Sequence, residues 1–266
     1  MFILIFFILG LMVGSFLNVV VYRLRVAESF VVGRSYCPHC RTQISWYDNI
    51  PVLSFILLKF RCRACKEKIS WQYPLVEIFT AFIFVFIGHS YFLLDDFYTW
   101  IETFYYLGIA SFLLVIFVYD FLYMEIPALA LWPGIVFTVA FNLFFDWNAY
   151  DFSAGPLGLA TYSGTLGALA AFFFFFLLVA VSKEKWMGMG DAYLVIFLGL
   201  IVGWPEILLA LMASFSLGAI IGLVLITFGK KKMESQLPFA PFLVLGTLIA
   251  MFWYSPIVEW YLGLFY

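Results

Sequence analysis

Two acidic residues stand at the borders of long apolar stretches. Asp120 ends one stretch in "LLVIFVYDFLYMEIP", and Asp191 opens another in "GMGDAYLVIFLGL". A charge beside hydrocarbon is costly unless it is paired or hydrated, so acids in such places indicate functional sites. Two carboxylates that share a proton can activate water for attack on a peptide carbonyl, one as base and the other as acid. Hydrolysis of a peptide bond is therefore the candidate chemistry.

Simpler explanations differ for the two acids. Aspartate is a favoured N-cap, so capping alone could account for Asp191 at the start of a helix. Asp120 closes a helix, where its charge faces the negative end of the macrodipole, and hydration at the membrane border is the alternative there. If both are catalytic, the helix ends favour Asp191 as the ionised base and Asp120 as the proton carrier. This assignment is a hypothesis, because coupled acids titrate as a pair and not as separate residues.

The cysteines indicate a metal site. All four lie in one short segment as Cys37-x2-Cys40 and Cys62-x2-Cys65, with 21 residues between the two pairs. Two such pairs offer four thiolates to one tetrahedral ion, although this spacing is just outside the usual range of about 15–20 residues. We expect a structural zinc site, with free or redox-active thiols as the alternative. His39 could replace one cysteine as a ligand.

The composition is that of a membrane protein. Of 266 residues, 65% are hydrophobic and 11% are charged, and the mean hydropathy is +1.05. Soluble domains carry roughly 25% charged residues. The apolar runs approach the roughly 20 residues that a helix needs to span a bilayer and do not alternate as barrel strands do. We therefore expect an all-α polytopic membrane protein, and no nucleic-acid partner.

Eight apolar segments are expected to be helical spans. They cover residues 2–22, 74–94, 101–119, 127–145, 158–181, 191–203, 206–228 and 239–262. The sixth is short for a span. All fourteen Lys and Arg residues fall in the odd-numbered connections: Arg23, Arg25, Arg34, Arg41, Lys59, Arg61, Arg63, Lys66, Lys68, Lys183, Lys185, Lys230, Lys231 and Lys232. Because basic residues mark the cytoplasmic side, both termini are expected outside and both acids at the inner border.

The chain divides into three parts on this view. Residues 1–22 form the first span, residues 23–73 a small cytoplasmic module with the four cysteines, and residues 74–266 a seven-helix membrane domain with both acids. A reducing cytoplasm favours metal-bound thiolates over disulfides in the module. Glu77, at the start of the second span, either pairs with a nearby Lys or Arg or binds a ligand.

Six motifs in this order resemble the bacterial type IV prepilin peptidases, which are membrane aspartyl proteases of the GxGD type. They are "GSFLNVVVYRL" at 14–24, the double CxxC around "NIPVLS", "YPLVE" at 73–77, "YDFLYMEIP" at 119–127, "GMGD" at 188–191 and "LPFAPFLVLG" at 237–246. The resemblance covers almost the whole chain. It implies catalytic roles for Asp120 and Asp191 in a bacterial cytoplasmic membrane protein whose active site faces the cytoplasm.

The resemblance also implies the substrates. Prepilins and pilin-like proteins would lose a basic leader after glycine, and many members then methylate the new N-terminus with S-adenosylmethionine. A pilin helix must unwind for cleavage, and Gly188 and Gly190 are candidates for a flexible active-site loop. The motifs do not locate the cofactor, for which Glu77 is a weak candidate.

Three positions depart from the family pattern: Ala81, Ala128 and Tyr193 stand where relatives often carry glycine, a polar residue and a basic residue. Ala81 weakens the expectation of methyl transfer. Two other interpretations remain open. One is a protease-only GxGD enzyme of the preflagellin or presenilin type, which usually lacks the four-cysteine module. The other is a non-enzymatic scaffold or transporter with a zinc knuckle.

Overall fold

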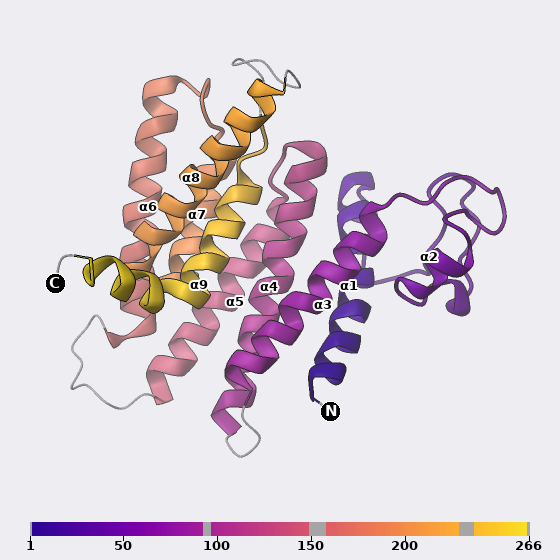
Figure 1. Cartoon of the computed structure of the whole chain (residues 1–266), viewed down its shortest axis with the longest axis horizontal. Coiled ribbons are helices and arrows are strands. Elements are labelled where there is room, and N and C mark those ends of the chain that lie inside the picture. Colours follow the sequence, from indigo (N-terminus) through magenta and orange to yellow (C-terminus); the bar gives the residue numbers. More distant parts are fainter. Residues whose placement is uncertain (1, 93–96, 149–157, 229–236, 265–266) are drawn as a thin grey trace. The chain divides into compact units, whose positions relative to one another are not determined.

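The described part of the chain is built from helices. A computed structural model describes residues 2–92, 97–148, 158–228 and 237–264, and no named β-strand occurs in these ranges. Figure 1 shows the long helices and, beside them, a small module of loops and short helices. The expected all-α fold is confirmed. Lys230, Lys231 and Lys232, which were used above to assign the cytoplasmic side, lie outside the described residues.

Ten helical elements follow in chain order. They are α1 (Phe2–Val26), the 3-10 helix η1 (Trp46–Asp48), α2 (Leu53–Leu57), α3 (Gln72–Tyr91), α4 (Phe97–Tyr123), α5 (Ala128–Asn148), α6 (Ala160–Ser182), α7 (Met189–Val202), α8 (Glu206–Thr227) and α9 (Ala240–Leu262). Seven of them are long and apolar enough to cross a membrane, and α7 is a shorter apolar helix of 14 residues. The chain is therefore a multi-pass membrane protein, and the sixth expected span is the short one.

Two expected spans end four residues before the observed helices do. The first span was expected to end at residue 22, but α1 continues to Val26 and includes Arg23 and Arg25 in its last turn. The third was expected to end at residue 119, but α4 continues to Tyr123, so Asp120 lies within the helix. Hydropathy marks where apolar residues stop, whereas helical hydrogen bonding continues into the polar border.

The chain forms two compact units, Met1–Val118 and Tyr119–Tyr266. In the N-terminal unit, α1 and α3 lie side by side (Figure 1). Their backbones approach closely because α1 presents glycine: a Cβ on Gly10 would lie 2.5 Å from Ala81 Cα, and one on Gly14 would lie 2.7 Å from Glu77 Cα. Small residues of this kind let helices in lipid gain van der Waals contact. The two helices that flank the four-cysteine module therefore pack closely against each other.

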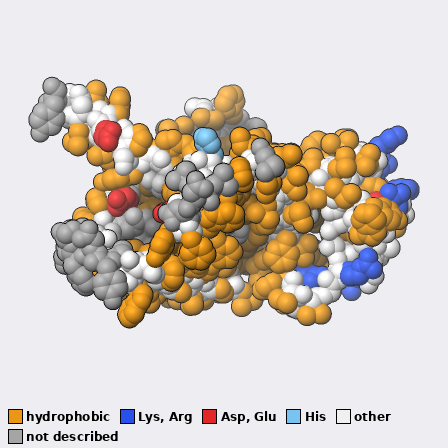
Figure 2. Space-filling model, turned by 90° about the horizontal axis from the view of Figure 1, so that it is seen from below, with side chains coloured by type: hydrophobic (Ala, Val, Ile, Leu, Met, Phe, Trp, Pro, Cys, Tyr) orange, Lys and Arg blue, Asp and Glu red, His pale blue; other side chains and the backbone are white. Residues whose placement is uncertain are grey.

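The four-cysteine module connects α1 to α3 and contains η1 and α2. On the face shown in Figure 2, Lys and Arg side chains gather in one region, whereas hydrophobic side chains cover much of the remaining surface. Exposed apolar residues on the long helices, such as Phe82 and Leu177, are expected where lipid is the solvent.

Helix pairs organise the C-terminal unit: α6 packs on α7, and α8 packs on α9. A Cβ on Gly199 of α7 would clash with the backbone of Ala168 in α6. Polar groups also join neighbouring helices. Asn142 Nδ2 of α5 donates to Leu200 O of α7 at 2.9 Å, and the carboxylate of Asp146 accepts the Ala160 N–H at 2.7 Å where α6 begins. The Gly199 and Asn142 contacts hold the short α7 against α6 and α5, and the Asp146 contact joins α5 to α6.

Candidate active site and metal centre

The two Cys-x2-Cys turns of the module fold in the same way. Arg41 N–H donates to Cys37 O at 2.9 Å in the first, and Lys66 N–H donates to Cys62 O at 3.0 Å in the second. Arg41 and Lys66 both adopt left-handed conformations, with φ of 56° and 62°. Each turn is closed by one antiparallel bridge, Tyr36 with Gln43 in the first and Arg61 with Lys68 in the second. Two equivalent hairpin turns thus present the four thiols.

The four sulfur atoms converge. The Sγ atoms of Cys37, Cys40, Cys62 and Cys65 all lie within 4.8 Å of one another and could hold a metal ion. Tetrahedral zinc with sulfur at about 2.3 Å places its ligands about 3.8 Å apart. The Cys37 and Cys65 sulfurs are 4.0 Å apart, which fits that geometry. His39 is not a member of this group among the described residues, so the expected cluster of four cysteines is confirmed and the histidine substitution is not supported.

Local hydrogen bonds favour thiolates at two of these positions. Cys40 Sγ lies 3.3 Å from Thr42 Oγ1, and hydrogen bonds with the side chain and backbone of Thr42 lower the pKa of the Cys40 thiol to about 6. The backbone amide of Cys65 is the main cause that lowers the pKa of the Cys62 thiol. Metal ions bind the deprotonated form of cysteine. The pKa of the Cys65 thiol is instead raised to about 11 by burial and by the neighbouring thiols, so the loops favour the thiolate form at Cys40 and Cys62 only.

Asp120 lies in the last turn of α4 and is only 5% exposed. Its Oδ2 accepts a hydrogen bond of 3.2 Å from the backbone N–H of Ala240, the first residue of α9. The carboxylate therefore faces the positive end of α9 as well as the negative end of its own helix. Because two helix ends of opposite sign act on Asp120, helix dipoles alone do not identify Asp120 as the proton carrier and Asp191 as the base.

Asp191 lies in the first turn of α7. The N-cap of this helix is Gly188, and the backbone N–H of Asp191 donates to Gly188 O at 3.2 Å. The capping explanation for Asp191 is therefore wrong. Asp120 and Asp191 both belong to the C-terminal unit, Asp120 in the last turn of α4 and Asp191 in the first turn of α7. One compact unit thus contains two acids that are 71 positions apart in the sequence.

Only one of the two glycines expected in a flexible loop lies before the helix. Gly188 has an extended backbone before α7, but Gly190 already belongs to the helix. A Cβ on Gly190 would meet the side chain of Ile126 at 3.3 Å, whereas one on Gly188 would make only an ordinary contact of 3.9 Å with the backbone nitrogen of Gly190. Gly190 therefore permits a close approach between α7 and the turn after α4. Glu125 lies in that turn and is exposed.

Glu77 lies in the N-terminal unit on α3 and is 7% exposed. Its Oε2 accepts the backbone N–H of Val52 at 2.8 Å, and it also forms a hydrogen bond with Ser15. The expected pairing with a Lys or Arg is not found among the described residues. Instead, a neutral amide from the module and a neutral hydroxyl from α1 contact this buried carboxylate.

Comparison with known proteins agrees with this arrangement. Residues 107–223 match the type IV leader peptidase family, and residues 8–91 match the bacterial peptidase A24 N-terminal domain. Three curated relatives are each called prepilin leader peptidase/N-methyltransferase. The chain is 31% identical to the one from Pseudomonas putida over 92% of this chain and 88% of the relative. It is 30% identical to the one from Bacillus subtilis (strain 168) over 97% of each, and 30% to the one from Aeromonas salmonicida over 97% and 92%.

The chain belongs to the type IV leader peptidase family. No solved structure matches it. Asp120 and Asp191 both lie within the residues that match the peptidase family, and the four cysteines lie within the matched N-terminal domain.

Three residues that hold the structure together had no site role in the predictions from sequence. Asn18 Nδ2 donates to Tyr73 O at 3.1 Å and so ties α1 to the start of α3. The buried guanidinium of Arg23 binds three carbonyls of the following loop, those of Ser29, Val32 and Arg34, at 2.8–3.0 Å. The third residue, Ala240, carries the amide that contacts Asp120. Asn18 and Arg23 could have been singled out in the sequence because each is a polar residue within the apolar first helix of this leader peptidase family member.

Proposed function

We propose that this protein removes the basic leader of type IV prepilins or pilin-like proteins and then methylates the new N-terminus. The observation that carries the cleavage step is that Asp120 and Asp191, each at a helix end, lie in one compact unit of a peptidase family member. Both acids come from apolar helices, where an unpaired charge is unfavourable without a function. Relatives that carry the name of both activities support the second step.

In the proposed reaction, the two carboxylates hold one proton between them. The ionised carboxylate takes a proton from water as the water oxygen attacks the scissile carbonyl, and the protonated one donates to the carbonyl oxygen. Collapse of the tetrahedral intermediate breaks the C–N bond and returns a proton to the leaving amine. The Ala240 N–H, which contacts Asp120, holds that carboxylate in position during these transfers.

We further propose that the module binds zinc with Cys37, Cys40, Cys62 and Cys65. Four protein ligands close the coordination sphere, so this ion would support folding and leave no position for catalytic water. The sulfur separation supports zinc, and the reducing cytoplasm expected for the module makes metal-bound thiolates preferable to a disulfide.

The proposed location is the bacterial inner membrane, with the active site near its cytoplasmic face. The basic residues that follow α1 and α6 support this orientation, since such residues remain on the cytoplasmic side. With eight membrane helices, both termini would be outside. A prepilin has a basic leader inside and an apolar helix in the bilayer, so its cleavage point would lie at the depth of the acids.

A reconstituted assay tests both steps separately. Purified full-length protein is mixed with a prepilin-like precursor, with or without S-adenosylmethionine, and the products are followed by intact mass spectrometry. We expect leader loss under both conditions and a methylated N-terminus only with the cofactor. Absence of cleavage would contradict the proposal as a whole. Cleavage without methylation would leave a protease-only enzyme, the alternative that Ala81 favours.

A further inference from the structure

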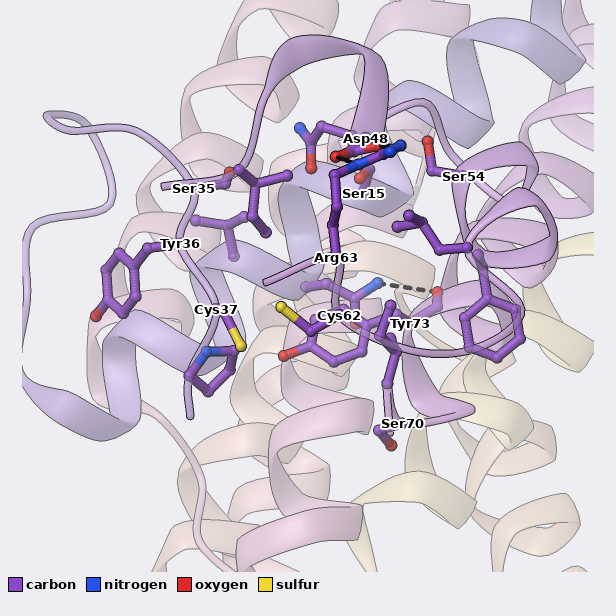
Figure 3. Close-up of a pocket in the computed structure, with 18 of the residues that line it drawn as sticks. Ser15, Ser35, Tyr36, Cys37, Asp48, Ser54, Cys62, Arg63, Ser70 and Tyr73 are labelled. Carbon is purple, nitrogen blue, oxygen red and sulfur yellow. Dashed lines mark hydrogen bonds and ion pairs between the residues drawn. The ribbon is translucent and has the colours of Figure 1, made fainter. Parts of the chain in front are cut away.

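The four-cysteine module has an inner side that faces the helices. This side lines a cavity of about 560 Å³ between the module and the ends of α1 and α3. Figure 3 shows Cys37, Cys62 and Tyr73 around this cavity. Arg63 also lines it and donates to both carboxylate oxygens of Asp48 at 2.7 Å. Arg63 therefore has its acidic partner within the module.

The short helix α2 has a second side, which faces away from this cavity. Ser54 and Phe55 are buried and line the cavity. The other three residues of the helix, Leu53, Ile56 and Leu57, are exposed and do not line it. Single exposed apolar residues are ordinary on a protein surface, but a contiguous group indicates contact with another surface. In the described part of the chain, α2 thus presents an uncovered apolar side.

Two aromatic residues extend this apolar side. The turn after α2 brings Phe60 back to the helix, because its N–H donates to Phe55 O at 2.9 Å. The Phe60 ring stacks on Trp71 with centroids 5.5 Å apart, and both side chains are exposed. Neither residue lines the cavity. The outer face of the module therefore consists of five residues: Leu53, Ile56, Leu57, Phe60 and Trp71.

Trp71 joins the outer face to the lipid-facing side of α3. Its backbone is helical, with φ of −62° and ψ of −18°, and its carbonyl accepts the Leu75 N–H at 3.2 Å. Leu75, Phe82 and Phe86 follow it at helical spacing on one side of α3, and all three are exposed. An exposed apolar stripe along a membrane span contacts lipid. The outer face therefore continues a surface that lies in the bilayer.

The charges beside the outer face are basic. Lys59 and Arg61 flank Phe60 in the chain, are exposed and do not line the cavity. Among the residues that the structure describes, neither forms an ion pair with an acid, in contrast to Arg63. Basic residues interspersed with Trp and Phe are typical of surfaces that lie on anionic lipid. An acidic protein would neutralise the cations but would not explain the continuity with α3.

We propose that the outer face of the module lies on the bilayer beside α3, with its apolar side chains in the headgroup layer and with Lys59 and Arg61 against the phosphates of anionic phospholipids. The module thus contacts the membrane through this face as well as through the two helices that flank it. Trp71 sets the depth of the contact, since Trp residues are enriched at membrane interfaces. This contact is independent of the proposed cleavage and methylation.

Photo-crosslinking to lipid tests the contact in the full-length protein. The photoreactive residue p-benzoylphenylalanine replaces Leu57 on the outer face, Gln43, which is exposed but lines the cavity, or Phe82 in the membrane span. Each protein is placed in nanodiscs of phosphatidylcholine alone or of equal parts phosphatidylcholine and phosphatidylglycerol, and lipid adducts are measured by mass spectrometry after irradiation. In the anionic bilayer, we expect the yield at position 57 to approach that at position 82 and to exceed that at position 43.

Two sets of substitutions in the protein with the probe at position 57 separate charge from apolar contact. Lys59→Gln with Arg61→Gln should lower the yield of lipid adducts in the anionic bilayer by about 5-fold or more, because each basic residue near such a surface strengthens binding roughly 5-fold. Ile56→Gln changes an exposed apolar side chain and should lower the yield in both bilayers, because less apolar surface is then buried in lipid.

A matched control makes the same change in charge elsewhere. Lys183→Gln with Lys185→Gln removes two exposed basic residues after α6 in the C-terminal unit and should leave the yield at position 57 unchanged. Thermal unfolding and limited proteolysis identify any variant whose module is not folded.

The yields decide between lipid, protein and solvent at the outer face. Adducts at position 57 that depend on phosphatidylglycerol and on Lys59 and Arg61 support the contact. A yield no higher than at position 43, in both bilayers and with a folded module, would overturn it. Equal yields in the two bilayers would overturn the assignment to anionic lipid. Adducts with a second copy of the chain or with an added prepilin-like precursor, in place of lipid, would also overturn it, because the face would then bind protein.

Discussion

The cysteine module and the pair of acids are assembled by different kinds of contact. Two short turns with nearly identical backbone hydrogen bonds present the four thiols, and each turn spans only a few residues. The acids come from α4 and α7, and a third helix, α9, contacts Asp120 from 120 positions away in the sequence. The metal centre is thus set largely by local chain geometry, and the candidate protease site by tertiary packing.

This difference determines how each site should fail. A local turn that loses one ligand loses its ion and then its fold, because a module of this size has little core of its own. A site built on packed helices can lose one carboxylate and keep its structure, since the neighbouring helices hold the backbone. Changes to the acids should therefore affect chemistry, whereas changes to the cysteines should affect structure.

The largest expected effect is on cleavage by the acid variants. Asp120→Asn and Asp191→Asn should each lower kcat for leader removal by about 10²–10⁴-fold, the range typical of general acid–base groups. Glu125→Gln in the exposed turn after α4 is the matched control and should remain within a few-fold of wild type. Circular dichroism and thermal unfolding should show folded proteins throughout. Substantial cleavage by either Asn variant would refute the paired-acid mechanism.

Removal of metal ligands should affect the other region. Cys40→Ser with Cys62→Ser should reduce zinc from one ion per chain to none, measured by atomic emission, because structural zinc binds only through a complete ligand set. Limited proteolysis should then cut within the module. His39→Ala should keep its zinc. Loss of zinc from His39→Ala would instead show that His39 is a ligand, so the two cysteine turns alone would not form the metal site.

Contact between α9 and Asp120 gives an intermediate effect. Ala240→Pro removes the amide that donates to the carboxylate, while proline is accepted at the first position of a helix. Hydrogen bonds to charged groups contribute about 1.5–3 kcal/mol, so kcat should fall by about 10- to 100-fold. Ala240→Gly keeps the amide and serves as the control. Equal activity of the two variants would mean that the N–H does not position Asp120.

The smallest effect concerns pH and the module. Hydrogen bonds from Arg63 hold the pKa of Asp48 below its usual value of 3.8. A lowered pKa adds stability that is present above the unfolded value and is lost as pH falls through the folded value. Acid should therefore destabilise the wild-type module more steeply than Asp48→Asn below about pH 4. Arg63 is 62% exposed, so the difference should be small and should shrink in high salt. If the stability of the two proteins changes equally with pH, the ion pair makes no measurable contribution to the pH dependence.

Much of this organisation was predictable from the sequence, for reasons that differ by region. The spacing of Cys37, Cys40, Cys62 and Cys65 implies their convergence because each pair closes a local turn. Hydropathy and the positions of basic residues predict that Asp120 and Asp191 lie at one membrane border, and this stays a prediction. The approach of Ala240 to Asp120 was not predictable, because it depends on how α9 packs. The contact of Glu77 with the Val52 amide was not predictable either, because it depends on how the module packs on α3.

The close contact of α1 and α3 has a consequence for where the module works. Gly10 and Gly14 bring the two backbones together, and both helices run directly into the module. The module is therefore attached to two closely packed apolar helices, and we expect its height above the bilayer to follow from their hydrophobic length. A thicker or thinner membrane should then raise, lower or tilt the module, so lipid composition should affect its position relative to the bilayer surface.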